Sequence, residues 1–392
     1  MFQTLDTATR RLYILLLFAF AVFGMIMTIA GAALPQIIRT FHWSYTIMGL
    51  VLAASSLGYV FSTFLSGILA QKIAPKAVLI AGVIIGAVGM SLFVRWPSPW
   101  LNLLFNLAVG LCQGALEVIG NLEIIHMERN GQSRLMNLSH SAFCIGALGG
   151  PLALGYILKS GYSVITVFAV AGALLALLAV LFAVTRFPRV RQEPGHEERE
   201  GLRLLRQPLL LLLIIMFLLY VGCEIGVSSW TSEFFVTLFG ATASTGAFIV
   251  ALFWVGLLIG RVGISFFYKG TRQENLMLAI ISTSAAALLV ALLAHSTAAV
   301  AVAIVFVGLG FSGFYPLAMT VVGRYYKSGM AVGSAAAGGA TGSVVFPFIM
   351  ALLSQTVGMR GGFWFYLGLN LLLVGLTAVL VRMVHRRRRG KA

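Results

Sequence analysis

The sequence predicts an all-α polytopic membrane protein, with twelve transmembrane helices arranged as two pseudo-symmetric six-helix bundles. Three observations predict this class: 60% of the 392 residues are hydrophobic, only 10% are charged, and the mean hydropathy is +0.99. Soluble proteins carry nearer ~25% charged residues. One helical crossing takes ~20 apolar residues, so the apolar runs have room for about a dozen helices. Their continuity excludes a β-barrel, whose strands alternate apolar and polar residues.

Clusters of charged residues, Pro and Gly separate the twelve spans. The first span is a retained helix rather than a signal peptide, because its apolar run continues to Leu34, beyond the ~7 to 15 residues of a signal h-region. In chain order, the predicted spans are 12–34, 45–70, 77–95, 100–126, 136–158, 163–185, 208–232, 243–268, 275–295, 298–322, 330–356 and 362–384.

The basic charge balance indicates how the chain is oriented in the membrane. The formal net charge is +16, but no soluble domain carries a basic face, so nucleic acid is not an expected partner. With both termini cytoplasmic, all but four of the 27 Lys and Arg residues fall on the inner side. We therefore expect a monomer in a plasma or bacterial inner membrane, with the basic tail from Arg386 to Lys391 near anionic lipid heads.

The chain divides near its middle. Residues 1–187 form the predicted N-terminal bundle, the Arg- and Glu-rich residues 188–207 a cytoplasmic linker, and residues 208–392 the C-terminal bundle with its basic tail. Weak internal matches favour a duplication. They link 108–111 to 306–309, Pro151 to Pro347, and Gly67 to Gly260.

Span four carries a polar stripe. Its members lie on one face of a helix and are Asn102, Asn106, Gln113, Glu117 and Asn121. A charged group at the bilayer centre costs ~2.5 to 3.5 kcal/mol, so a mid-span carboxylate normally faces a cavity or a partner. Two interpretations follow: a buried, hydrogen-bonded helix contact, or a stripe that faces a central cavity, where Glu117 exchanges protons and Gln113 and Asn121 bind solute.

Span seven repeats this arrangement with Tyr220, Glu224, Ser228 and Trp230. Glu224 is the second candidate for proton coupling. Aromatic faces stack on sugar rings and polar groups bind hydroxyls, so the mixture suits a sugar, and it equally suits an aromatic solute. Trp230 could instead be an interfacial belt residue, and Glu233 is expected to be solvated.

Span five adds His140 and Asn137 as solute ligands, although a lone His is more often a helix contact. Its Gly150 and Pro151, with Pro347 in span eleven, predict bends and sliding surfaces for a rocking motion. No Gly-x-x-x-x-Gly-Lys-Ser/Thr loop supports ATP-driven transport, and Cys112, Cys144 and Cys223 lie in apolar runs without the spacing of a metal site. We expect no cofactor, no metal and no enzyme activity.

Several segments resemble the fucose/glucose:proton symporter branch of the major facilitator superfamily. They are Leu116-Glu117-x-x-x-Asn121, Met136 to His140, Phe143-x-Ile145-Gly146-Ala147, Gly150-Pro151, Tyr220-Val221-Gly222-x-Glu224 and Ser229-Trp230. The resemblance implies a major facilitator fold, alternating access and sugar uptake driven by a proton gradient. It also places Glu117 at the position of the branch's proton carrier in span four.

Two departures from the family pattern affect coupling and gating. The fucose carriers' second coupling Asp, in span one, is Gly31 here. In the superfamily's loop signature after span two, which starts at Gly67 and includes Lys72, the Asp is replaced by Gln71. This weakens the usual charge latch at the cytoplasmic gate, and Gly260-Arg261 retains part of it in the second half.

The leading hypothesis is a secondary transporter of a sugar or similar small polar solute, binding midway between the halves and coupled to protons through Glu117, Glu224 or both. The rival is a proton-coupled exporter of drugs or metabolites, because Gly146-x-x-x-Gly150-Pro151 also resembles a signature of proton antiporters. A non-transporting membrane sensor and a lipid flippase are further alternatives.

Overall fold

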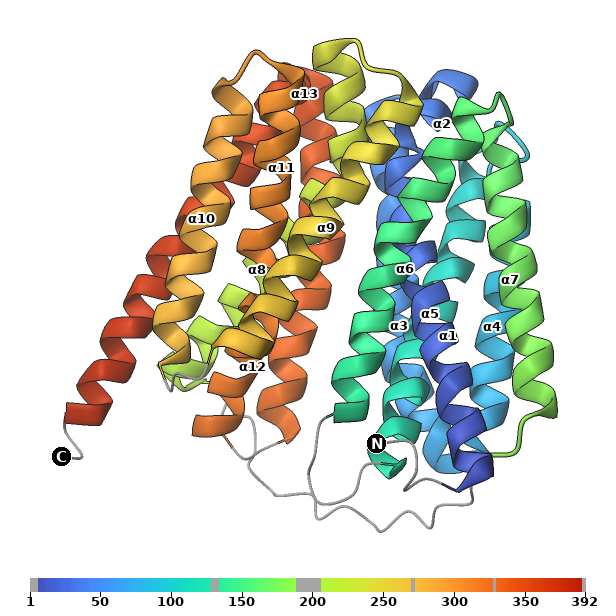
Figure 1. The fold of residues 1–392 in the computed structure, drawn as a ribbon, viewed down its shortest axis with the longest axis horizontal. Coiled ribbons are helices and arrows are strands. Elements are labelled where there is room, and N and C mark those ends of the chain that lie inside the picture. Colours follow the sequence, from blue (N-terminus) through green and yellow to red (C-terminus); the bar gives the residue numbers. More distant parts are fainter. Residues whose placement is uncertain (1–5, 128–133, 188–205, 269–271, 327–328, 390–392) are drawn as a thin grey trace. The chain divides into compact units, whose positions relative to one another are not determined.

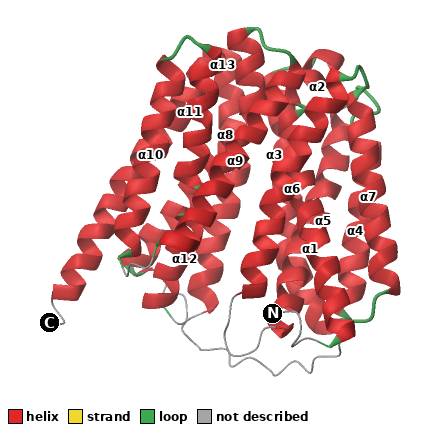
Figure 2. Ribbon diagram, viewed as in Figure 1, coloured by secondary structure: helices red, strands yellow, loops and turns green. Residues whose placement is uncertain are grey.

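The computed structural model describes residues 6–127, 134–187, 206–268, 272–326 and 329–389. All regular secondary structure in these ranges is helical (Figures 1 and 2). The chain forms two compact units, Met1–Pro194 and Gly195–Ala392, called the N-terminal and C-terminal units below. Most of the predicted linker, 188–207, lies outside the described residues, as does the end of the basic tail.

Among its described residues, the N-terminal unit contains seven helices. They are α1 (Thr7–Ala32), α2 (Leu34–Phe41), α3 (Tyr45–Lys72), α4 (Pro75–Leu92), α5 (Pro99–Met127), α6 (Arg134–Lys159) and α7 (Val164–Val184). Local chemistry sets several starts: the Ser44 side chain accepts from the Ile47 N–H at the start of α3, and Pro75 occupies the first turn of α4. The short helix α2 follows the first span directly and was not expected.

The C-terminal unit contains α8 (Pro208–Phe239), α9 (Ala243–Phe267), α10 (Gln273–Leu293), α11 (Thr297–Phe311), α12 (Phe314–Tyr325) and α13 (Gly329–Arg389). Helix α8 continues past the predicted end at 232 and stops where Gly240 adopts φ 63°. A residue in the left-handed backbone conformation commonly ends a helix, and Gly adopts that conformation most easily because it has no Cβ.

The number of crossings agrees with twelve. Eleven described helical stretches are long and apolar enough to cross a membrane, with α11 and α12 counted as one stretch. The last stretch holds two crossings, because Gly358 in α13 has φ 80° and ψ 166° and interrupts the helix between the two predicted spans. The tenth predicted span is split into α11 and α12, which the sequence did not indicate.

Each unit repeats the same close helix contacts. In the N-terminal unit, a Cβ on Gly58 would lie 2.3 Å from the Leu107 carbonyl oxygen and a Cβ on Gly110 1.9 Å from that of Ser55, so α3 and α5 touch backbone to backbone. In the C-terminal unit, Gly256 and Gly308 join α9 to α11 in the same way, at 1.9 and 2.0 Å from carbonyl oxygens. Each lies 198 residues further along the chain (58 to 256, 110 to 308), so the duplication is visible in the packing.

The packing corrects one internal match. A Cβ on Gly114 would meet Ser62, and a Cβ on Gly260 would meet Ser312. The same spacing (62 to 260, 114 to 312) pairs Gly260 with Ser62, so the sequence match of Gly260 with Gly67 is wrong. At this crossing the N-terminal unit has its serine on α3 and its glycine on α5, whereas the C-terminal unit has its glycine on α9 and its serine directly after α11.

Candidate functional site

The polar stripe of α5 begins with two structural anchors. Asn102 accepts from the Val94 N–H at 2.7 Å and donates to the Trp96 and Ser98 carbonyls at 2.7 and 2.8 Å, which fastens the loop before α5. Asn106 donates to the Val51 carbonyl of α3 at 2.7 Å. These two residues match the helix-contact interpretation of the stripe.

The remaining stripe residues form a polar cluster with α3. Ser55 donates to Gln113 Oε1 at 3.4 Å, and one turn further along both helices the Tyr59 hydroxyl donates to the Glu117 carboxylate. Gln113 is buried, whereas Glu117 is partly exposed. Asn121, one turn beyond Glu117, has a buried Oδ1 without a hydrogen-bond partner among the described residues. An acceptor in this state is open to a donor from a bound molecule.

Helix α6 carries the remaining predicted site residues of the N-terminal unit. His140 is partly exposed, and its ring packs edge-on against Phe20 at 5.6 Å between centroids. The side chain of Asn137 lies outside the described residues. Gly150 is buried against Met25 and Ile29 of α1, and the buried Pro151 lies inside α6.

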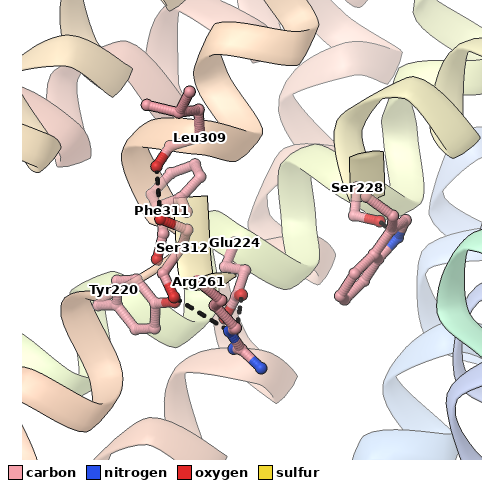
Figure 3. Close-up of polar contacts among 8 residues, drawn as sticks. Tyr220, Glu224, Ser228, Arg261, Leu309, Phe311 and Ser312 are labelled. Carbon is pink, nitrogen blue, oxygen red and sulfur yellow. Dashed lines mark hydrogen bonds and ion pairs between the residues drawn. The ribbon is translucent and has the colours of Figure 1, made fainter. Parts of the chain in front are cut away.

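In the C-terminal unit, the candidate site surrounds the break between α11 and α12. Helix α11 ends at Phe311 and α12 begins at Phe314, which leaves backbone carbonyls without helical partners. The Tyr220 hydroxyl of α8 donates to the Phe311 carbonyl at 2.8 Å, and Arg261 Nε of α9 donates to the Ser312 carbonyl at 3.0 Å (Figure 3). Two side chains from neighbouring helices therefore satisfy the interrupted backbone.

Glu224 lies one turn beyond Tyr220 and forms an ion pair with Arg261 (Figure 3). The distance from Arg261 Nη2 to Glu224 Oε1 is 3.9 Å, and the side chains retain 27% and 10% of their exposure, respectively. Both residues lie within candidate membrane spans. A charged pair within such spans is a functional-site candidate.

The outer part of α8 is packed within its own unit. Ser228 accepts from Trp254 Nε1 at 3.0 Å. Trp230 is fully buried, rather than displayed at a surface as an interfacial belt residue would be. The expectation that Glu233 is solvated is wrong: its side chain is buried and accepts from Thr237 at 2.6 Å, because α8 continues for two more turns.

The predicted gating residues lie in different environments. A Cβ on Gly67 would meet nothing within 4 Å, and Lys72 is exposed at the end of α3. Gly260 packs against Ser312 next to the helix break, directly before Arg261. Pro347 is buried inside α13.

Several partners in these clusters were missed by sequence reasoning. Ser55 and Tyr59 lie four residues apart on α3, a helical spacing that could have marked a polar face opposite α5. The break at Ser312-Gly313 and the role of Trp254 left no such signal, because Ser, Gly and Trp are ordinary residues in membrane spans.

Comparisons with known proteins agree on one family. The family model described as Major Facilitator Superfamily matches residues 16–270 and 268–392. Bypass of stop codon protein 6 of Saccharomyces cerevisiae is 24% identical over 389 residues, which covers 88% of this chain and 77% of that protein. The sodium-dependent glucose transporter 1A of Mus musculus is 21% identical, covering 86% of this chain and 88% of that protein.

Solved structures show the same fold. A bacterial homolog of the human lysosomal transporter Spinster, in an inward-facing and unoccupied conformation, has a TM-score of 0.78 at 15% identity, covering 96% of this chain and 98% of that one. The transporter FucP in the outward conformation has a TM-score of 0.63 at 20% identity, covering 94% and 98%. At these identities the likeness concerns the fold and leaves the branch of the family open.

Proposed function

The chain belongs to the Major Facilitator Superfamily, and from this premise we propose that it carries a sugar or a similarly small polar organic solute by alternating access, coupled to protons. Its family and fold make it a multi-pass membrane transporter and not an enzyme. The identities of the solute and of the coupling ion are the proposed part, and a transport assay tests both.

One observation carries the proposal: each unit holds a carboxylate inside a candidate membrane span with a partner from a neighbouring helix. Glu117 accepts from Tyr59, and Glu224 pairs with Arg261. Protonation of either carboxylate weakens its contact with that partner, so proton binding is linked to the packing of α5 against α3 and of α8 against α9. This linkage is what a proton-driven carrier needs, because a proton can change a conformational equilibrium only through contacts that differ between states.

A sugar-like solute fits the groups near the carboxylates. Gln113 and Asn121 offer amide groups beside Glu117, and His140 adds a polar ring on α6. The mouse relative is named a sodium-dependent glucose transporter, which supports a sugar as the proposed solute. Gly150, Pro151 and Pro347 are the proposed bends for alternating access, and both termini are proposed to be cytoplasmic because the basic residues cluster on that side.

The test is uptake of labelled monosaccharides into proteoliposomes under an imposed pH gradient, with a sodium gradient as a second arm. We expect accumulation with the proton gradient, and its loss in Glu117→Gln or Glu224→Gln while unlabelled-for-labelled exchange persists. Glu233→Gln is the matched control, since it removes a buried carboxylate of α8 that accepts from Thr237 on the same helix. Accumulation driven only by sodium, or no accumulation, would overturn proton coupling.

A further inference from the structure

The Ser312 carbonyl at the α11–α12 break accepts from a side chain rather than from the helix backbone. In an uninterrupted α-helix this carbonyl would accept from residue 316, which is a Pro and has no N–H. Pro316 lies in the first turn of α12, where a Pro is tolerated. Arg261 Nε supplies the donor instead, at 3.0 Å. The backbone donor that would ordinarily replace Arg261 at this carbonyl therefore does not exist.

The Arg261 guanidinium joins this carbonyl to Glu224 (Figure 3). Its Nε donates to Ser312, and its Nη2 lies 3.9 Å from Glu224 Oε1. Both nitrogens belong to one planar, rigid group, so a rotation that changes one contact also changes the other. The attraction of an ionised Glu224 for Nη2 therefore helps to set the direction in which Nε points.

Glu224 is the group through which acid acts on this cluster. Tyr220, one turn earlier on α8, interacts electrostatically with both Glu224 and Arg261, and it donates to the Phe311 carbonyl at the same break. The other titratable groups that the described contacts place nearby are Cys223 on α8, Tyr315 on α12 and Tyr366 on α13. Tyrosine, cysteine and arginine side chains already hold their protons at neutral pH. A carboxylate is the one group of this set that takes up a proton as the pH falls.

We propose that Arg261 is a positioning residue, which passes the protonation of Glu224 on to the α11–α12 break. This inference rests on the proposed function, in which Glu224 takes up the coupled proton, and it adds the element that responds. The ionised carboxylate holds the guanidinium toward the Ser312 carbonyl and so stabilises the break. Protonation removes that attraction, whatever else Arg261 contacts. The hold on the break then weakens, and α12 gains freedom to change its angle to α11.

The test is backbone hydrogen exchange of the full-length protein in lipid nanodiscs, without solute, at several values between about pH 5 and pH 8. The reporter is the start of α12, where the Leu317 N–H donates to the Gly313 carbonyl at 3.1 Å. Rates are converted to protection factors, which removes the intrinsic pH dependence of exchange and leaves the local opening equilibrium. We expect protection there to fall at least about threefold as the pH falls, and by no more than about tenfold per pH unit, because one proton is involved.

Two variants and a matched control locate the effect. Glu224→Gln carries no charge at any pH, so protection at the start of α12 should stay at the low, acidic value throughout. Arg261→Lys keeps the positive charge and loses the planar fork, so the pH response should disappear although the charge pair can still form. Arg324→Gln is the control: Arg324 lies in the last turn of α12 and pairs with Glu274 at the same 3.9 Å separation. Its loss should leave the pH response at the start of α12 unchanged.

The outcomes separate this inference from the function beneath it. Protection that does not change with pH overturns the inference, and proton-coupled uptake in the same protein would leave the proposed function standing. A pH response that survives Glu224→Gln or Arg261→Lys also overturns it, as does a response that Arg324→Gln abolishes. A response that depends on both Glu224 and Arg261, in a protein whose uptake ignores the proton gradient, supports the inference and overturns proton coupling. If Arg261→Lys does not fold, the pH profiles of the wild type, Glu224→Gln and Arg324→Gln decide.

Discussion

Replacing Gly146 with Ala should separate α1 from α6. A Cβ at Gly146 would lie 1.7 Å from the Ala21 carbonyl oxygen, where real Cβ contacts stay beyond 3.0 Å. The facing Gly24 makes the reciprocal contact, 2.0 Å from the Phe143 oxygen. Both obstacles are backbone atoms, so no side-chain rotation relieves the clash, and the helices must move apart by more than an ångström.

The expected loss of stability follows from the contacts that this movement disturbs. Overpacking of a tight contact costs about 1 to 3 kcal/mol. The separation also stretches the 3.1 Å hydrogen bond from Thr28 Oγ1 to the Ala147 carbonyl, worth about 1 kcal/mol. Together these predict a destabilisation of about 2 to 4 kcal/mol for Gly146→Ala.

Gly149, on the same helix, provides the matched control. A Cβ there meets nothing within 4 Å, so Gly149→Ala should be neutral or stabilise the protein by up to about 1 kcal/mol through helix propensity. Unfolding in detergent can be followed with a thiol-reactive fluorophore, because the free cysteines Cys112, Cys144 and Cys223 are all buried. Equal unfolding midpoints for the two variants would refute the backbone contact between α1 and α6.

Three further substitutions test other contacts. Tyr220→Phe removes the donor to the Phe311 carbonyl and should lower the free energy of unfolding by about 1 to 3 kcal/mol. Backbone hydrogen exchange at the start of α12 should become faster, and unchanged exchange there would contradict a stabilising role of this hydrogen bond at the α11–α12 break. Tyr59→Phe removes the donor to Glu117 and should lower solute-driven proton uptake several-fold in proteoliposomes, whereas wild-type uptake would reduce Tyr59 to a packing residue. Asn102→Leu removes the hydrogen bonds that hold the loop before α5 and should lower the free energy of unfolding by about 2 to 3 kcal/mol. Solute selectivity in uptake assays should stay unaltered, and an altered selectivity would show that Asn102 contacts the solute.

The crossings could be predicted from the sequence because the bilayer imposes a length on each apolar run. The break at Ser312-Gly313 could not, since small residues in a span more often serve close packing than an interruption. Gly358 is a similar case. Its positive φ divides α13, but a Gly between two apolar runs does not by itself specify its backbone angles.

The candidate site was predictable in its residues and not in its pairings. Helical periodicity placed Gln113, Glu117 and Asn121 on one face, but the same periodicity included Asn102 and Asn106, which bind backbone groups. Glu224 and Arg261 were each singled out, for coupling and for gating, while their ion pair depends on how α8 packs beside α9. Partners across helices are set by tertiary packing, which a single sequence does not reveal.

The glycine and serine at one helix crossing occupy opposite positions in the two units, which bears on how the two halves are related. Ser62 faces Gly114 in one unit, and Gly260 faces Ser312 in the other. Two copies of an ancestral segment have therefore kept the combined bulk at this crossing, while neither position kept its residue. Aligning the halves letter by letter scores both sites as mismatches, although the packing at this crossing pairs the same two residue types.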